Sequence, residues 1–315
     1  MRVLVAGATG ALGMKLVPKL VAAGHRVIAT TRNPDKGQSL FASGAELAEM
    51  DGLDATSVSE TVTRNQPDAI IHQMTALAGE PDMRHFDRWF SATNELRTKG
   101  TDLLLGAART AGVDTFIAQS YTGWNNQRTG GPVKTEEDPL DQSPTRQQSQ
   151  TLAAIRKLEE TVLSAPLKGI VLRYGNFYGP GASEGLVELV SKRQMPVIGG
   201  GAGVWSWIHV GDAASATVAA LEKGSRGVYN VVDDEPATAA EWLPHLARAV
   251  GARPPIRMPA WLARILAGQT VVQWMTEGRG ASNAKAKAGL GWELKWPSWR
   301  NGFEHALTEF DSDLS

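Results

Sequence analysis

The first half of the chain alternates short apolar runs with longer stretches whose apolar residues recur at helical spacing. The apolar runs predict strands at Val3–Ala6, Val27–Thr31, Ala48–Met50, Ala69–Gln73, Thr115–Gln119 and Gly169–Tyr174. The stretches with helical spacing predict helices at Met14–Ala23, Thr98–Thr110 and Leu152–Ser164. Strands that alternate with helices are typical of a parallel sheet with crossover helices. We therefore predict an α/β fold built on a doubly wound parallel sheet.

The composition changes in the second half of the chain. The segments Asn125–Gln150 and Gly179–Gly203 are rich in Gly, Pro, Gln and Ser, which predicts loops or lids. Eight of the 10 tryptophans follow Gly203, which indicates a smaller C-terminal lobe of different composition. We expect a larger domain at 1–180, to which 205–232 returns, and a smaller lobe formed by 181–204 and 233–315.

Composition and charge narrow the classes of partner. The 315 residues carry 32 basic and 33 acidic side chains, a balance that gives no sign of a nucleic-acid or membrane partner. The lack of cysteine excludes disulfides, thiolate metal sites and a cysteine nucleophile, and the histidines do not have the spacing of a metal motif. No leader pattern and no run of about 18 apolar residues is present, so we expect a cytoplasmic protein without a membrane span.

A glycine-rich turn directly follows the first predicted strand and opens the first predicted helix. It reads Gly7-Ala-Thr-Gly10-Ala-Leu-Gly13. The backbone N–H groups of such a turn approach a pyrophosphate closely, and the positive end of the helix dipole favours the anion. The strand before the turn and the helix after it are the context that this motif requires. We therefore predict a dinucleotide site formed by Gly7, Thr9, Gly10, Ala11, Leu12 and Gly13.

The end of the second predicted strand bears on which nicotinamide cofactor binds. An acidic residue there would bond the ribose 2′-hydroxyl of NAD and repel the 2′-phosphate of NADP. This strand ends instead in Thr30-Thr31-Arg32, and the next carboxylate is Asp35. Because a guanidinium pairs well with a phosphate, Thr31 and Arg32 predict NADP, with NADPH preferred over NADH.

The spacing GxxGxxG, rather than GxGxxG, resembles that of the extended short-chain dehydrogenase/reductase superfamily, to which NAD-dependent epimerases and dehydratases belong. Further segments resemble the family in register: Asp51–Asp54, Pro67–Thr75, Gly100–Ala108, Arg173–Gly181, Trp207–Asp212 and the run from Ser282 to Trp292. The resemblance spans nearly the whole chain. It implies a Rossmann domain with a smaller substrate-binding lobe.

The resemblance also implies positions for the rest of the cofactor. It implies that Asp51 and Gly52 contact the adenine. It places Met74 and Thr75 at the ribose, and Asn176 and Phe177 at the nicotinamide. In the family's adenine-binding turn, the residue at the place of Asp51 bonds the adenine amino group.

The catalytic pair of the family is missing. Its dehydrogenases use a tyrosine and a lysine four residues later on one helix face, where the lysine cation lowers the tyrosine pKa. The chain has 4 tyrosines, and the residues four positions after them are Asn125, Tyr178, Ala182 and Asp233. Alignment of the helix on Glu159 puts Thr151 and Ile155 at the two positions. A slip by one residue puts Leu152 and Arg156 there instead.

The family's serine cluster corresponds to Ala118-Gln119-Ser120-Tyr121-Thr122. In this register Tyr121 takes the position of the family's catalytic serine or threonine. Its phenol would donate a proton from the other wall of the pocket, or would serve as an aromatic wall. With no lysine to lower its pKa from about 10, Tyr121 suits a proton donor better than a base. Ser120 and Thr122 are further candidates for the catalytic hydroxyl.

Three tryptophans bear on the substrate. Trp124 follows the Tyr121 segment, and Trp205 and Trp207 lie where the two lobes should meet, on one side of the chain if it is extended. Aromatic rings there suit an apolar or aromatic substrate, although ordinary core filling is the alternative. Lys192 and Arg193 are the only basic pair in 179–193, which disfavours a nucleotide-sugar substrate.

Three functions fit these features. The first is an NADP-dependent oxidoreductase that acts on a small apolar or aromatic carbonyl or conjugated compound, with a proton from Tyr121 or water. The second is an enzyme that retains its nucleotide and catalyses no net redox change, such as an epimerase, dehydratase or cyclase. The third is a non-catalytic NADP-sensing protein. The sequence leaves the oligomeric state open. Dimers of the family pair two long helices, so a homodimer of this chain would use Thr98–Thr110 and Leu152–Ser164.

Overall fold

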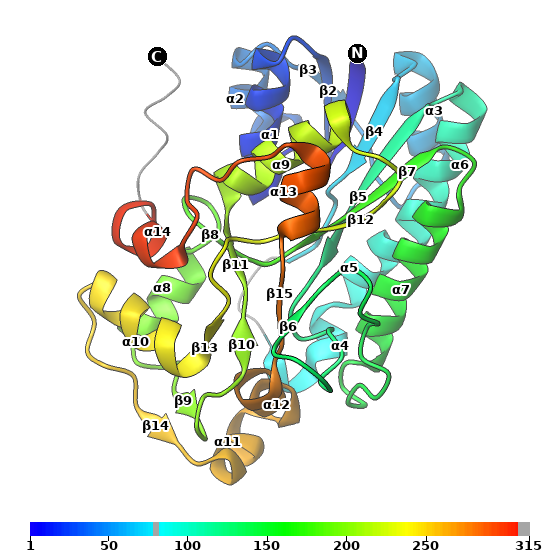
Figure 1. Ribbon diagram of the computed structural model, residues 1–315. Coiled ribbons are helices and arrows are strands. Elements are labelled where there is room, and N and C mark those ends of the chain that lie inside the picture. The colour runs from blue at the N-terminus through cyan, green and yellow to red at the C-terminus, as the bar shows by residue number, and fades with distance from the viewer. Residues whose placement is uncertain (78–81, 308–315) are drawn as a thin grey trace.

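The computed structural model of the chain describes residues 1–77 and 82–307, and a parallel sheet runs through its middle (Figure 1). The 7 strands lie in the order β12-β7-β5-β4-β1-β2-β3, and each neighbouring pair is parallel. They are β1 (Arg2–Ala6), β2 (Arg26–Thr31), β3 (Glu46–Glu49), β4 (Ala69–His72), β5 (Thr115–Tyr121), β7 (Lys168–Tyr174) and β12 (Gly227–Val231). The order reverses between β1 and β4, the switch point at which open α/β sheets bind ligands. This topology confirms the predicted doubly wound α/β fold.

Helices cover both faces of the sheet (Figure 1). One face carries α1 (Ala11–Ala22), α9 (Val210–Lys223) and α13 (Ala284–Leu290), and the other carries α3 (Ala55–Asn65), α6 (Thr101–Ala111) and α7 (Ser149–Ser164). Side chains of β1 alternate between the two cores: Val3 and Val5 pack with α1, whereas Leu4 and Ala6 pack with α3. Because both faces are buried, the strand is apolar at successive positions.

The remaining elements form a smaller lobe around a cluster of tryptophans. They are α8 (Glu184–Ser191), β9 (Val197–Ile198), β10 (Val204–Trp205), β13 (Ala237–Thr238), α10 (Ala239–Ala249), β14 (Arg257–Met258), α11 (Ala260–Ala267), α12 (Gln269–Glu277) and α14 (Trp299–His305). Two short pairs join this lobe to the sheet: β8 (Asn176–Tyr178) with β11 (Trp207–His209), and β6 (Val133–Lys134) with β15 (Gly280–Ala281). Short helices α2 (Gln38–Ala42), α4 (Phe86–Trp89) and α5 (Ser91–Glu95) complete the fold. The two-lobe division stays a prediction, and its part beyond residue 307 lies outside the described residues.

Several predicted elements differ from the structure. Helix α1 begins at Ala11 rather than Met14, and β3 spans Glu46–Glu49 rather than Ala48–Met50. Helix α7 begins at Ser149 rather than Leu152, because the carboxylate of Asp87 in α4 accepts hydrogen bonds from the backbone N–H groups of Gln150 at 3.0 Å and Thr151 at 2.8 Å. The predicted helix at 98–110 is split into a π-helical turn at 96–100 and α6. The segment 179–203, predicted as a loop, contains α8, whose apolar residues are flanked by glycine and proline on both sides.

A buried ion pair attaches α7 to the sheet. Glu159 accepts hydrogen bonds from the guanidinium of Arg173 on β7, at 2.8 Å from Nε and 2.6 Å from Nη2. The same carboxylate accepts the hydroxyl hydrogen of Ser120 on β5 at 2.7 Å. The two charged side chains are 7 % and 8 % exposed. One carboxylate therefore connects a helix to two neighbouring strands near their carboxyl ends.

Breaking this pair should destabilise the whole domain. Arg173→Met leaves the carboxylate of Glu159 buried and unpaired, so we expect the free energy of unfolding to fall by about 3–5 kcal/mol in a urea titration. Lys157→Met is the control on the same helix, because its exposed ammonium lies 3.8 Å from Asp102 and should add little to stability. A urea midpoint for Arg173→Met equal to that of the wild type would contradict the anchoring role of the pair.

Candidate cofactor and active site

The predicted cofactor and catalytic residues lie along the carboxyl edge of the sheet. Gly7 follows β1 with φ +90°, and a Cβ there would lie 2.8 Å from backbone atoms of Gln73 and Met74 at the end of β4. Only glycine tolerates both the conformation and the close approach. Gln73 Nε2 donates to the phenol oxygen of Tyr174 at 3.4 Å, and the backbone N–H of Thr122 donates to the Tyr174 carbonyl at 3.0 Å. These contacts connect the glycine turn to the segment that follows β5.

The turn also leaves the start of α1 open. Gly10 is the N-cap of this helix, no side chain caps it, and its first turn holds no acidic residue. By contrast, Asp54 caps α3 by accepting the N–H of Ser57 at 2.7 Å. A Cβ on Gly10 would meet only the Gly7 carbonyl oxygen, at 3.5 Å. The free N–H groups and the open space beside Gly10 suit a pyrophosphate, so the turn fits the predicted dinucleotide.

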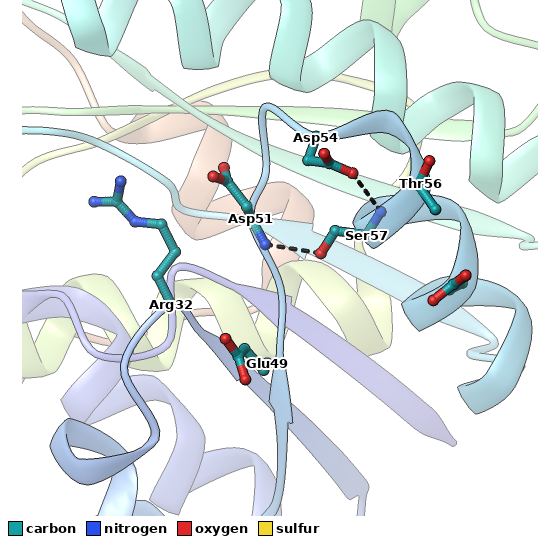
Figure 2. Close-up of a pocket in the computed structure, with 7 residues that line it drawn as sticks. Arg32, Glu49, Asp51, Asp54, Thr56 and Ser57 are labelled. Atoms are coloured by element: carbon teal, nitrogen blue, oxygen red, sulfur yellow. Dashed lines mark hydrogen bonds between the residues drawn. The ribbon is translucent and has the colours of Figure 1, made fainter.

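An open groove of about 650 Å³ lies beside the end of β3, where the adenine is predicted (Figure 2). Its walls are formed by Arg32, Glu49, Asp51, Asp54, Thr56, Ser57 and Glu60. The Asp51 backbone N–H donates to Ser57 Oγ at 3.0 Å, and Asp51 Oδ1 accepts the N–H of Leu53 at 3.0 Å. The carboxylate of Asp51 is therefore held in place by its own turn. Its role toward adenine stays a prediction.

Arg32 extends from the end of β2 along the rim of this groove (Figure 2). Its side chain is exposed and has no hydrogen-bond or ion-pair partner within the described part of the chain. Thr31 lies beside the glycine turn, with its Oγ1 3.5 Å from that of Thr9. Glu49 faces Thr31 in the β2–β3 register, so the rim presents carboxylates as well as a cation. A phosphate would find its partner at Arg32, on the side away from Glu49.

The residues predicted near the ribose and nicotinamide occupy the next turns along the edge. Met74 packs over Gly52, whose Cβ would collide with the Met74 sulfur. Thr75 is exposed. Asn176 donates from Nδ2 to the Ser206 carbonyl at 3.0 Å, and the ring of Phe177 lies 5.3 Å from that of Tyr174. The predicted adenine turn therefore contacts the end of β4. Asn176 and Phe177 belong to β8, beside the carboxyl edge of the sheet.

Tyr121 ends β5, and its phenol reaches β8. Its hydroxyl donates to Asn176 Oδ1 at 2.9 Å, and its ring stacks on Trp124 with centroids 6.2 Å apart. Burial raises the pKa of Tyr121 above its usual value. The phenol therefore stays protonated at neutral pH, so it can donate a hydrogen bond or a proton but cannot act as a base.

The two hydroxyls beside Tyr121 point into the protein. Ser120 donates to Glu159, and Thr122 accepts from Asn126 Nδ2 at 2.9 Å. Ser120 is 3 % exposed and Thr122 1 % exposed. Of the three predicted catalytic hydroxyls, these two are engaged in structural hydrogen bonds, and Tyr121 is the one that lies against Asn176.

In the register aligned on Glu159, the helix positions of the tyrosine–lysine pair hold Thr151 and Ile155, both fully or almost fully buried. In the register slipped by one residue they hold Leu152, which is also buried, and Arg156, whose Nη2 donates to the Asp141 carbonyl. Thr151 Oγ1 donates to Asp87 Oδ1 at 2.6 Å and accepts from Asn94 Nδ2 at 3.0 Å. Ile155 packs in an apolar cluster with Phe86. The hydroxyl hydrogen of Thr151 is thus held by a carboxylate that also caps α7, and Ile155 offers no charge. Neither position can supply the acid–base chemistry of the pair.

The partners of Thr151 were not predicted. Asp87 lies in α4 and Asn94 in α5, which are 64 and 57 positions from Thr151. Both elements are shorter than the windows in which apolar periodicity can be read. No local pattern marks these two residues, because their role depends on a contact between distant segments.

The three tryptophans have different surroundings. Trp124 is 8 % exposed and contacts Phe86 edge-on, with centroids 5.0 Å apart, in addition to Tyr121. The rings of Trp205 and Trp207 stack 5.9 Å apart, so they lie on one side of the chain as predicted. Trp205 also stacks at 4.2 Å on Trp274. Both belong to the core of the smaller lobe, which favours core filling over contact with a substrate, whereas Trp124 borders Tyr121 directly.

Within residues 1–77 and 82–307, no group of three or more His, Cys, Asp or Glu side chains is arranged to hold a metal ion. Over the same ranges, none of the helices has the length and apolar character needed to cross a membrane.

Comparison with known proteins identifies the family. Residues 3–232 match the model of the NAD dependent epimerase/dehydratase family. A 3-diazoavenalumate denitrifying reductase from Streptomyces sp is 43% identical over 307 residues, which cover 96% of this chain and 99% of the relative. The structure of the human epimerase family protein SDR39U1 with NADPH superimposes with TM-score 0.74 at 23% identity, covering 98% of this chain and 99% of that chain. The structure of Thermus thermophilus UDP-glucose 4-epimerase with NAD gives a TM-score of 0.72 at 24% identity and covers 98% of both chains. These matches confirm the resemblance that the motifs predicted, and the chain belongs to the NAD dependent epimerase/dehydratase family of enzymes.

Proposed function

We propose that the protein is an NADPH-dependent reductase of a small conjugated diazo compound, which reacts in its diazonium form and takes the hydride at the carbon that bears the two nitrogens. The support from similarity is the relative at 43% identity, which is named as a reductase that denitrifies a diazo compound and which aligns over 99% of its length. Its substrate, 3-diazoavenalumate, is named as the anion of an acid. We extend to this chain the class of reaction and the class of substrate.

The observation that carries the proposal is the loss of the acid–base pair on α7, where Thr151 is bound to Asp87 and Ile155 is apolar. Reduction of a carbonyl needs a proton on oxygen as well as a hydride on carbon. Bound NADPH supplies a hydride, and exchange of a diazonium group for it balances without a proton, since R–N2⁺ plus hydride gives R–H plus N2. The hydride electrons form the C–H bond, and the C–N bond electrons leave with N2. This reaction has no need of a tyrosine–lysine pair.

In this proposal the residues of the chain bind and orient rather than transfer protons. The glycine turn and the uncapped start of α1 hold the pyrophosphate. Tyr121, fixed by its hydrogen bond to Asn176, forms with Trp124 an aromatic wall on which a conjugated acceptor stacks. Ser120 and Thr122 keep that wall in place through their bonds to Glu159 and Asn126, which are structural roles.

The cofactor preference for NADPH is part of the proposal. It rests on the exposed, unpaired guanidinium of Arg32 and on a β2 end without a carboxylate. Solved relatives of the same fold contain NADPH in one case and NAD in another, so the fold accepts both. The side chain at the end of β2 is the feature that separates them.

The cofactor preference predicts the behaviour of one variant. Fluorescence titration should show NADPH binding more tightly than NADH, and Arg32→Ala should weaken NADPH by about tenfold or more while NADH is unchanged, because a charge-assisted pair with the 2′-phosphate is lost. Arg26→Ala is the control, since it removes an arginine at the other end of β2 that pairs with Glu46. Equal weakening of both nucleotides, or none, would refute the role of Arg32.

The proton-free chemistry predicts how Tyr121→Phe behaves. With a diazo substrate such as 3-diazoavenalumate, the variant should oxidise NADPH at a rate within a few-fold of the wild type, whereas loss of a general acid costs about 10²–10⁴-fold. Tyr229→Phe, at a tyrosine whose hydroxyl bonds to Ser225, is the matched control for removal of a phenol oxygen. A loss of two orders of magnitude in Tyr121→Phe alone would mean that the reaction needs a proton from Tyr121, and would contradict the proton-free step.

A further inference from the structure

Arg97 lies in the π-helical turn η3 (Leu96–Gly100) between α5 and α6. A π turn widens the helix by one residue per turn, and such turns occur frequently at functional sites. Arg97 is 8 % exposed and is therefore a buried cation. It lies directly before the predicted helix Thr98–Thr110. A buried guanidinium without a carboxylate partner is costly, so its presence calls for a function.

The described residues leave most of its hydrogen-bonding capacity unused. Nη1 donates to the amide oxygen of Asn94 at 3.3 Å, and the guanidinium carbon lies 5.6 Å from the centre of the Phe90 ring. The side chain has no ion-pair partner among these residues, and the nearby carboxylate of Glu159 is already bound by Arg173 and Ser120. Nε and Nη2 of Arg97 have no hydrogen-bond partner among the described residues, and neither belongs to the partnerless polar atoms that the fold encloses completely, so both can still donate.

Hydrogen bonds connect Arg97 to the helix position of the missing catalytic tyrosine. Asn94, which accepts from Arg97, donates in turn to Thr151, at the position of the family's tyrosine. The charge of Arg97 also acts on His72 at the end of β4 and is attracted by Glu159 on α7. Burial lowers the pKa of Arg97 to about 10, so the group remains a cation at neutral pH. The turn that carries Arg97 contacts the end of β4, where His72 Nε2 lies 3.3 Å from the Leu96 carbonyl, and is linked to α7 through Asn94.

We propose that Arg97 binds a carboxylate group of the substrate. A guanidinium offers five N–H donors in a planar fork that matches a carboxylate, and the pair is strongest where water is excluded. The proposal rests on the proposed function and deepens it, because it assigns the substrate to conjugated carboxylic acids. The phosphates of the dinucleotide have other donors, at the glycine turn and Arg32, so a carboxylate is the anion that remains for this site.

The test uses an unreactive acid, so that it does not depend on turnover. Cinnamate and its neutral amide, cinnamamide, are titrated calorimetrically into the full-length protein saturated with NADP⁺. We expect the wild type to bind cinnamate at least about tenfold more tightly than the amide, from the value of a charge-assisted pair. Arg97→Met should abolish this preference, Arg97→Lys should retain part of it, and both should bind NADPH as the wild type does. Arg109→Met, at an exposed arginine of α6, is the matched control and should change nothing.

Several results would overturn the proposal: no preference for cinnamate in the wild type, an undiminished preference in Arg97→Met, or a loss of NADPH affinity of about tenfold in that variant, which would assign the guanidinium to the cofactor. If Arg97→Met does not fold, Arg97→Lys and the wild-type comparison of acid with amide still decide. Failure of the proposed function has a different signature, because NADPH would then not be consumed with a diazo substrate even though cinnamate binds.

Discussion

The arrangement of the active edge depends on one buried carboxylate. Glu159 binds Arg173 of β7 and Ser120 of β5, and so holds α7 against the sheet directly behind Tyr121. A carboxylate with three donors in a site from which water is excluded cannot move without leaving charges unpaired. The pair therefore fixes the end of β5, with Tyr121, in its position relative to helix α7.

On this scaffold, the face of α7 that carries the acid–base pair in the family holds a network of hydrogen bonds instead. A chain of hydrogen bonds runs from Arg97 through Asn94 and Thr151 to Asp87, and it ends in the carboxylate that caps α7. Every group in the chain donates in the same direction, so Thr151 has no proton to give to a substrate. The site keeps the uncapped start of α1 after the glycine turn and lacks the tyrosine–lysine pair. The proposed reaction, in which hydride replaces N2, accounts for both features, because it needs a bound nucleotide and no proton from such a pair.

The sequence was sufficient for the parts of the molecule that depend on local pattern. The apolar run Val3–Ala6 predicts a buried strand, and the order of strand, glycine turn and helix around Gly7 follows from residue spacing; the bounds of β1 and α1 and the burial of β1 confirm both. Counting tyrosines was enough to show that the catalytic pair is absent. What replaces that pair was not predictable, because Asp87 and Asn94 reach Thr151 through contacts between distant segments. The early start of α7 has the same cause, since its N-terminal N–H groups are capped by Asp87 rather than by a neighbouring residue.

The most direct test is the stoichiometry of a single reaction. The wild-type protein is incubated with NADPH and 3-diazoavenalumate labelled with ¹⁵N in both diazo nitrogens, and NADPH oxidation, ¹⁵N2 release and the organic product are measured together. The account predicts one NADPH oxidised for each ¹⁵N2 released, and a product that carries hydrogen at the carbon that lost nitrogen. Release of ¹⁵N2 without oxidation of NADPH, with a hydroxyl group on that carbon, would contradict it.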